Sequence, residues 1–235
     1  MSMAGQLLVL ISYPLAYFRR LWLPRGANAA VNPDNPPILL VHGLYHNASA
    51  WLFIKARLRA AGYDNVFAFS YSSWRTDYST LLAQFDKHVR ELERLYPKTP
   101  PVFIGHSLGG LIIRGWLKMN PHSPVRGVIT FGTPHQGSKL ARLGFGRLCH
   151  SLAFRGALIR KLEADEPSIT VPAVALFSRM DNMVLPMEGL KPRAAGWTLR
   201  ELTPVSHIFM LYSKVSFKEL LEELDKISGR RTTRQ

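Results

Sequence analysis

Short, uninterrupted apolar runs alternate with longer stretches along most of this 235-residue chain. Residues 38–41 (ILLV) are apolar throughout, which is typical of a strand buried on both faces of a parallel sheet. Similar runs predict further strands at 66–69, 102–104, 125–131, 173–177 and 198–202. The stretches between them predict helices at 50–61, 80–96, 108–119, one long helix within 139–164, and 217–227. This alternation predicts the α/β class, with a mostly parallel central sheet covered by helices on both faces.

A dense turn signal at 32–37 (NPDNPP) separates an N-terminal segment, residues 1–31, from everything that follows. The length of the chain fits one large α/β domain, which we place at 32–227. Residues 228–235 then form a basic tail. No second domain is predicted.

The N-terminal segment contains an apolar run at 7–18 that is interrupted by Pro14. The run is too short to cross a bilayer core of about 30 Å as a helix. Its arginines, at 19–25, follow the run, whereas a secretory signal carries its positive charge first. The small residues at 27–29 do resemble a cleavage site. The run is therefore either a membrane-surface helix or a helix packed on the domain. We expect a cytoplasmic or inner-membrane-associated protein, with export as the alternative.

The composition combines a globular apolar content with a strong positive charge. Hydrophobic residues make up 47% and charged residues 20%, which is enough apolar surface for a packed core. The net charge of +14 predicts attraction to anionic surfaces, such as phospholipid headgroups or nucleic acid. No RNA-binding aromatic box, basic zipper or zinc-finger spacing is present, so a nucleic-acid partner is not expected. The single cysteine, Cys149, excludes an intramolecular disulfide.

Residues 105–110 (GHSLGG) follow the predicted strand 102–104 and open the predicted helix 108–119. A G-x-S-x-G turn between a strand and a helix holds its serine in a strained backbone geometry, and its glycines keep the turn uncrowded. Ser107 would then project above the sheet at a helix N-terminus, which favours the negative charge that forms in acyl transfer. The alternative is a glycine-rich turn with an incidental serine.

The GHSLGG turn resembles the nucleophile elbow of the α/β-hydrolase family, and more narrowly of its lipase and esterase branch. Residues 41–44 (VHGL) resemble the family's oxyanion-hole loop. The resemblance implies an α/β-hydrolase fold with a small cap or none, and an oxyanion hole formed by the backbone N–H groups of Leu44 and Leu108. It also implies substrate contacts from His42 and Gly43 of the oxyanion-hole loop and from His106 of the GHSLGG turn. The alternative for His42 is that its imidazole ties the loop to its neighbours.

A serine hydroxyl needs a base, and the base needs an orienting carboxylate. The family order is serine, acid, histidine. This order implies His207 as the base of Ser107, and Asp181, which follows the predicted strand 173–177, as the acid. Asp181 could instead cap a turn. The fallback acids are Asp165 and Glu166.

The loop 131–138 (FGTPHQGS) is similar to a stretch found in many lipase-like hydrolases. The resemblance implies a wall of the acyl pocket, with Thr133 and His135 as substrate-binding residues. They could also be ordinary loop residues. No cofactor is predicted, and no metal site is evident because the His and Asp residues are scattered. A lipase-type calcium site is left open.

Residues 139–164 form a basic amphipathic stretch that invites two interpretations. It is either a short lid lying on an anionic lipid surface or a helix packed on the sheet with its charges in water.

The resemblance implies a serine hydrolase that cleaves carboxylic esters, of lipid or acyl type, through an acyl-enzyme. An acyltransferase or thioesterase with the same residues is one alternative. A catalytically silent hydrolase fold that acts as a binding module is another.

Overall fold

A computed structural model describes residues 22, 35–74, 76–164 and 166–230 of the chain. These residues form a six-stranded sheet in the order β2-β1-β3-β4-β5-β6, in which every neighbouring pair is parallel. The strands are β1 (Ile38–Val41), β2 (Val66–Phe69), β3 (Val102–His106), β4 (Gly127–Phe131), β5 (Ala173–Phe177) and β6 (Trp197–Glu201). The predicted α/β class with a mostly parallel central sheet is therefore confirmed.

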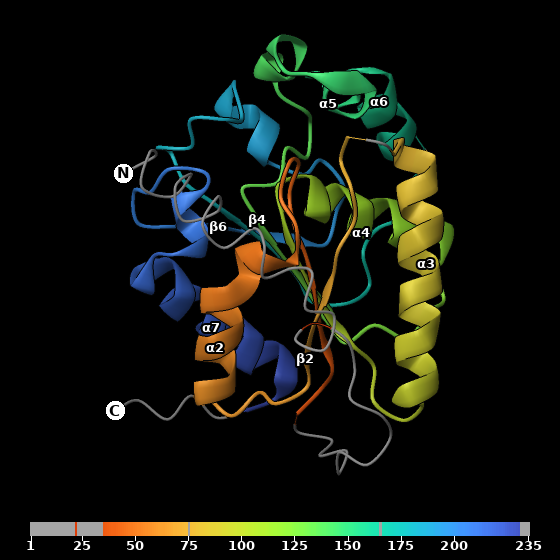
Figure 1. Cartoon of the computed structure of the whole chain (residues 1–235), viewed down its shortest axis with the longest axis vertical. Coiled ribbons are helices and arrows are strands. Elements are labelled where there is room, and N and C mark those ends of the chain that lie inside the picture. Colours follow the sequence, from red (N-terminus) through yellow and green to blue (C-terminus); the bar gives the residue numbers. More distant parts are fainter. Residues whose placement is uncertain (1–21, 23–34, 75, 165, 231–235) are drawn as a thin grey trace.

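Helices cover both faces of the sheet (Figure 1). The longer ones are α2 (Leu52–Ala60), α3 (Tyr78–Leu95), α4 (Leu108–Met119) and α7 (Lys214–Ser228), with short 3₁₀ turns at η3 (Ala48–Trp51), η5 (Met187–Leu190) and η6 (Phe209–Leu211). Successive side chains of a strand point to opposite faces. Ile38 and Leu40 accordingly enter the core beneath α2 and α7, whereas Leu39 and Val41 enter the core beneath α3 and α4.

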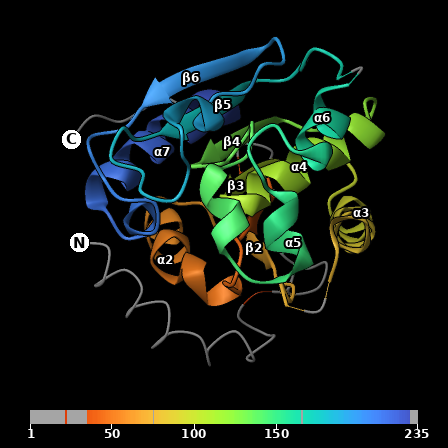
Figure 2. The same ribbon diagram turned by 90° about the horizontal axis from the view of Figure 1, so that it is seen from above.

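The stretch 139–164 is not one long helix, so that prediction is wrong. It divides into η4 (Lys139–Leu143), α5 (Gly146–Ser151) and α6 (Ala157–Glu163). Gly146 and Arg155 both have positive φ, at 85° and 50°, which a continuous right-handed helix does not allow. We refer to residues 139–151 as the cover, because Figures 1 and 2 show α5 lying above the upper end of the strands.

Trp22 is the one described residue of the N-terminal segment. Its side chain is buried in the core, and its carbonyl accepts a hydrogen bond of 3.1 Å from Ala68 N at the outer edge of β2. The apolar run 7–18, the fallback acid Asp165 and tail residues 231–235 lie outside the described residues. Among the helices that the structure describes, none has both the length and the apolar character needed to cross a membrane.

Candidate active site

Ser107 stands in a sharp turn between β3 and α4, with φ 54° and ψ −123°. A non-glycine residue with positive φ is strained and persists only where its surroundings hold it. A Cβ atom added to Gly105 would lie 2.6 Å from Gly110 N, and one added to Gly109 would collide with Val41 O. The glycines therefore let the turn close and let α4 pack directly on the end of β1.

The two residues predicted to form the oxyanion hole lie near Ser107 and come from different elements. Leu108 is the first residue of α4, so its N–H has no acceptor within its own helix. Leu44 lies in the loop after β1, and the preceding Gly43 packs so closely that an added Cβ would lie 2.9 Å from Ser107 Cβ. The predicted oxyanion loop and the nucleophile turn are thus in direct contact.

His42 anchors this loop through hydrogen bonds of its imidazole. Its Nδ1–H donates to Gly43 O at 2.8 Å, and its Nε2 accepts from Tyr71 N at 3.1 Å. The Tyr71 ring stacks on the imidazole at 3.9 Å, and its hydroxyl donates to His42 O at 2.7 Å. Burial lowers the pKa of His42 to about 3, so the ring stays neutral. These contacts fit the alternative role of His42, in which the imidazole ties the loop to its neighbours.

His207 and Asp181 form a buried hydrogen-bonded pair. His207 Nδ1 donates to Asp181 Oδ2 at 2.7 Å, and their side chains are only 6% and 1% exposed. The other carboxylate oxygen of Asp181 accepts from Met183 N and Val184 N, both at 2.9 Å. Asp181 therefore caps its turn and also binds the imidazole, so the contacts of the two roles that the sequence left as alternatives occur together.

Two contacts that the sequence did not indicate support this pair. Asn182 Oδ1 accepts from His207 N at 3.3 Å. Gly132 has φ 51°, and a Cβ atom there would lie 3.0 Å from His207 Nδ1 and 3.1 Å from Asp181 Oδ2. Gly132, the first glycine of the GTPHQGS loop, thus packs directly against the His207–Asp181 pair.

Two further histidines stand beside His207. His106 Nε2 donates to His207 O at 3.1 Å, and the His106 ring lies 6.0 Å from the His46 ring. Burial, followed by the charge on His207, holds the pKa of His106 well below its ordinary value and lowers that of His46 to about 4. Both rings are neutral near pH 7. His46 was not among the predicted site residues, although it lies only two positions after Leu44.

A cavity of about 420 Å³ opens between these residues and the cover. The following residues line it: Gly43, Leu44, Tyr45, His46, His106, Ser107, Pro134, Ser138, Leu140, Ala141, Gly144, Cys149, Leu152, Met183, Val184, His207 and Ile208. Ser107 and His207 thus face one largely apolar space. Of the other predicted site residues, Gly43, Leu44 and His106 also line it, whereas His42, Leu108, Thr133, His135 and Asp181 do not.

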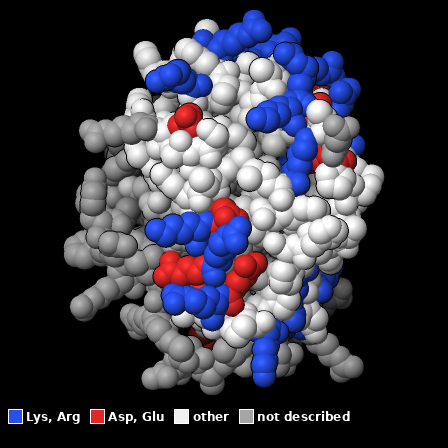
Figure 3. Space-filling model, turned by 90° about the vertical axis from the view of Figure 1, so that its right-hand side faces the viewer, with Lys and Arg blue, Asp and Glu red and all other residues white. Residues whose placement is uncertain are grey.

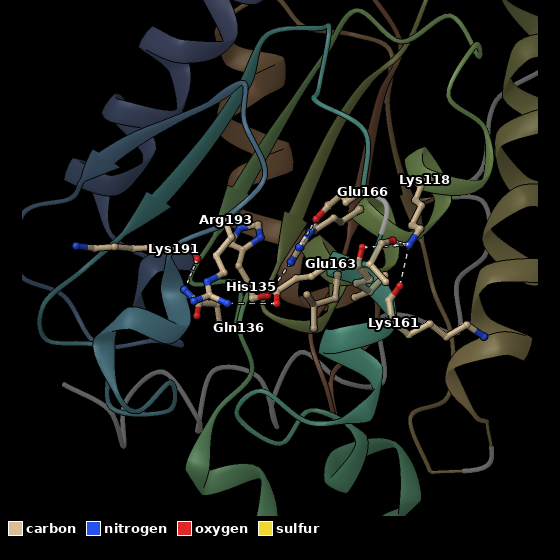
Figure 4. Close-up of polar contacts among 12 residues, drawn as sticks. Lys118, His135, Gln136, Lys161, Glu163, Glu166, Lys191 and Arg193 are labelled. Atoms are coloured by element: carbon tan, nitrogen blue, oxygen red, sulfur yellow. Dashed lines mark hydrogen bonds and ion pairs between the residues drawn. The ribbon is translucent and has the colours of Figure 1, made fainter.

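The loop 131–138 is fixed from behind by a buried ion pair. Arg114 of α4 donates to both carboxylate oxygens of Glu166, at 2.6 and 2.5 Å, and to His135 O at 2.6 Å. The Arg114 side chain is 1% exposed and that of Glu166 is 7% exposed. In Figure 4, dashed lines lead from Glu166 toward the loop that carries His135. Glu166, a fallback acid, therefore holds the loop through Arg114.

His135 points into this supporting layer. Its Nε2 lies 3.1 Å from Thr130 Oγ1, and burial holds its pKa well below the ordinary value. Pro134 and Ser138 are the members of the loop that reach the cavity. Across the described ranges, no three His, Cys, Asp or Glu side chains come together so that they could hold a metal ion.

The chain belongs to the alpha/beta hydrolase family, whose model matches residues 38–214. No curated protein matches the sequence significantly. Solved structures with the same fold include the mature lipase BlEst2 of Bacillus licheniformis, with a TM-score of 0.67 and 18% identity over 82% of this chain and 93% of that one. The monoacylglycerol lipase of Paleococcus ferrophilus has a TM-score of 0.60 and 19% identity, over 83% and 96%.

The phospholipase PlaB of Legionella pneumophila is similar over 83% of this chain and 63% of that chain, with a TM-score of 0.64 and 16% identity. At these identities the likeness shows the fold alone. The protein is thus an α/β hydrolase whose structural neighbours include lipases.

Proposed function

We propose that this protein is a serine hydrolase that cleaves carboxylic esters of lipids or other acyl compounds. The observation that carries the proposal is the buried His207–Asp181 pair, in which His207 lines the same apolar cavity as Ser107, a serine with strained backbone geometry. A histidine oriented by a carboxylate and a serine at a helix N-terminus are the parts that acyl transfer requires.

In the proposed mechanism, Ser107 Oγ attacks the ester carbonyl while His207 takes the hydroxyl proton. Asp181 holds the imidazole through Nδ1, which leaves Nε2 for the reaction, and stabilises the imidazolium. The N–H groups of Leu44 and Leu108 bind the oxyanion. His207 then protonates the leaving alcohol. A water molecule, deprotonated by His207, attacks the acyl-enzyme, and the acid is released as Ser107 regains its proton.

The lining of the cavity favours an acyl chain. Its walls beyond Ser107 are mostly aliphatic side chains, contributed by Leu140, Ala141, Leu152, Val184 and Ile208. A concave apolar site with few polar groups is typical of a pocket for an apolar ligand. The lipase and phospholipase names of the structural neighbours agree with such a substrate.

The outer surface of the cover fits an anionic lipid interface. Leu143 and Phe145 are 79% and 77% exposed. Basic side chains surround them in the sequence, at Lys139, Arg142 and Arg147. Figure 3 shows Lys and Arg gathered at the upper end of the molecule, where Figure 1 places α5 and α6. Exposed apolar side chains among basic ones suit binding to a charged bilayer surface. Anionic vesicles should therefore bind the protein and raise its activity on long-chain esters.

The experiment that tests the proposal is hydrolysis of p-nitrophenyl esters from acetate to palmitate by the wild type and by Ser107→Ala. We expect the variant to lose about 10⁴-fold or more in kcat, in line with other serine triads. Its failure to react with a fluorophosphonate that labels the wild type is the second readout. A wild type that is labelled but inert on every ester would favour acyl transfer to another acceptor. A wild type that is inert and unlabelled would overturn the proposal.

A further inference from the structure

Tyr45 connects the loop of Leu44 to the cover. Its Oη donates to Phe145 O at 2.5 Å and accepts from Phe145 N at 3.0 Å, so that one hydroxyl satisfies both backbone groups of a residue 100 positions away. Burial raises the pKa of Tyr45, so the phenol keeps the proton that it donates. Among the described residues, these are the hydrogen bonds that join 143–147 to the main body of the fold.

The backbone of Tyr45 stands where a turn normally uses glycine. His46 N donates to Gly43 O at 3.4 Å, which closes a four-residue turn with Leu44 and Tyr45 at its centre. Tyr45 has φ 59° at the third position, where positive φ usually requires glycine or asparagine. An aromatic residue remains in this conformation only if other contacts hold it there.

Those contacts come from two sides. Tyr45 N donates to Ser73 Oγ at 3.0 Å, and the ring stacks on Trp74 with centroids 4.6 Å apart. The hydroxyl provides the third point of attachment, at Phe145. The preceding residue in the same turn is Leu44, whose N–H we assign to the oxyanion. The conformation of that turn and the position of the cover are therefore held by the same side chain.

We propose that Tyr45 is a positioning residue that makes the cover and the oxyanion loop one unit. While its hydroxyl holds Phe145, the strained turn stays in place and the Leu44 amide stays aimed at the cavity. When the hydroxyl is removed, the turn relaxes and the amide loses its alignment. This inference rests on the proposed hydrolase function.

The test is Tyr45→Phe, which removes the hydroxyl and keeps the ring that stacks on Trp74. On p-nitrophenyl butyrate we expect kcat to fall about tenfold, with KM within about twofold. The loss is smaller than the 10²–10³ found when an oxyanion donor is deleted, because the Leu44 amide is still present. Hydrogen exchange of the amides at 143–147 should become faster, which is a readout that does not depend on activity.

The matched control is Tyr212→Phe. The Tyr212 hydroxyl is buried without a hydrogen-bond partner among the described residues, and the ring lies in the core on the α2 and α7 side. We expect this variant to keep kcat within about twofold and to leave exchange at 143–147 unchanged. Ser73→Ala is a second test, because it loosens the turn from the other side without touching Phe145, and it should lower kcat with normal exchange in the cover.

The outcomes separate the inference from the function on which it rests. Unchanged kcat in both Tyr45→Phe and Ser73→Ala, in a wild type that hydrolyses esters, would overturn the positioning role. Unchanged hydrogen exchange at 143–147 in Tyr45→Phe would show that the Tyr45 hydroxyl does not hold the cover. If the wild type neither hydrolyses esters nor reacts with fluorophosphonate, the proposed function fails. The exchange measurement then still decides whether the Tyr45 hydroxyl holds the cover. If Tyr45→Phe does not fold, Ser73→Ala decides the positioning role.

Discussion

The floor and the cover of the cavity are built in opposite ways. The floor consists of the loops that follow β1, β3, β4, β5 and β6, and it carries Ser107, Asp181 and His207. Asp181 in this floor accepts three hydrogen bonds. The cover is interrupted by Gly144 and Gly146 and exposes Leu143 and Phe145. Groups that exchange protons must keep fixed distances, whereas a wall over a substrate cavity is useful only if it can give way.

The contrast extends behind the site. The loop 131–138 is held by Arg114 and Glu166, a buried ion pair that removes both charges from water. Residues 143–147 of the cover are held to the main body by the hydroxyl of Tyr45. Substitutions in the floor should therefore have large effects, and substitutions in the cover small ones.

The largest effect is expected for Asp181→Asn. The amide oxygen can still accept from Met183 N and Val184 N, so the turn should keep its shape. The amide cannot hold the imidazole in the required tautomer or stabilise its charge, and kcat should fall about 10⁴-fold, as for a comparable substitution in a serine protease. Ester hydrolysis measures the loss, and circular dichroism checks the fold. A variant that stays within tenfold of the wild type would show that Asp181 is not the orienting acid.

Breaking the support of the floor should mainly reduce stability. Arg114→Met leaves the Glu166 carboxylate buried without its partner, and the free energy of unfolding should fall by about 3–5 kcal/mol. Urea unfolding measures this change.

The double variant Arg114→Met/Glu166→Leu is the control. It removes both charges, so we expect it to recover most of the lost stability, apart from the hydrogen bond to His135 O. If the single and double variants are equally unstable, the ion pair is not what holds the loop.

The same division separates what the sequence predicts from what it does not. The strands at 38–41 and 66–69 and the helix at 108–119 agree to the residue, because segments buried on both sides leave a local apolar pattern. The family order of serine, acid and histidine was also enough to select His207 and Asp181, which the structure places in contact.

Long-range polar contacts leave no such pattern. Arg114 interrupts an apolar helix without any sign of its partner 52 positions later, and the phenol of Tyr45 bonds a backbone 100 positions away. His42 and His135 occupy positions in the predicted motifs, yet both are buried residues that anchor their loops through hydrogen bonds. The break of 139–164 into three pieces depends on positive φ at Arg155 as well as at a glycine, which composition alone does not reveal.

An intermediate effect on stability is expected from acidification, which acts on the floor. Burial, followed by the charge on His207, lowers the pKa of His46 to about 4 in the folded protein. In an unfolded chain, where the imidazole is in water, its pKa is 6.5. Between these values the unfolded chain binds a proton that the folded protein does not, so stability is fully present above pH 6.5 and is lost as the pH falls.

This histidine should contribute a loss of about 1 kcal/mol between pH 7 and pH 5.5. Urea unfolding at the two pH values, for the wild type and His46→Asn, measures it. The variant should lose about 1 kcal/mol less than the wild type over this interval. Equal losses would mean that His46 is protonated in the folded state.

The smallest change in stability is expected in the cover. Leu143→Ser/Phe145→Ser removes apolar side chains that are already 79% and 77% exposed, so the free energy of unfolding should change by no more than about 0.5 kcal/mol. The same variant should bind anionic vesicles about tenfold more weakly, because those side chains would enter the bilayer surface. Cosedimentation with vesicles measures binding, and Arg142→Gln/Arg147→Gln, which keeps the apolar side chains, isolates the contribution of charge. A loss of stability above about 1.5 kcal/mol would mean that Leu143 and Phe145 pack within the fold, and the cover would then be as fixed as the floor.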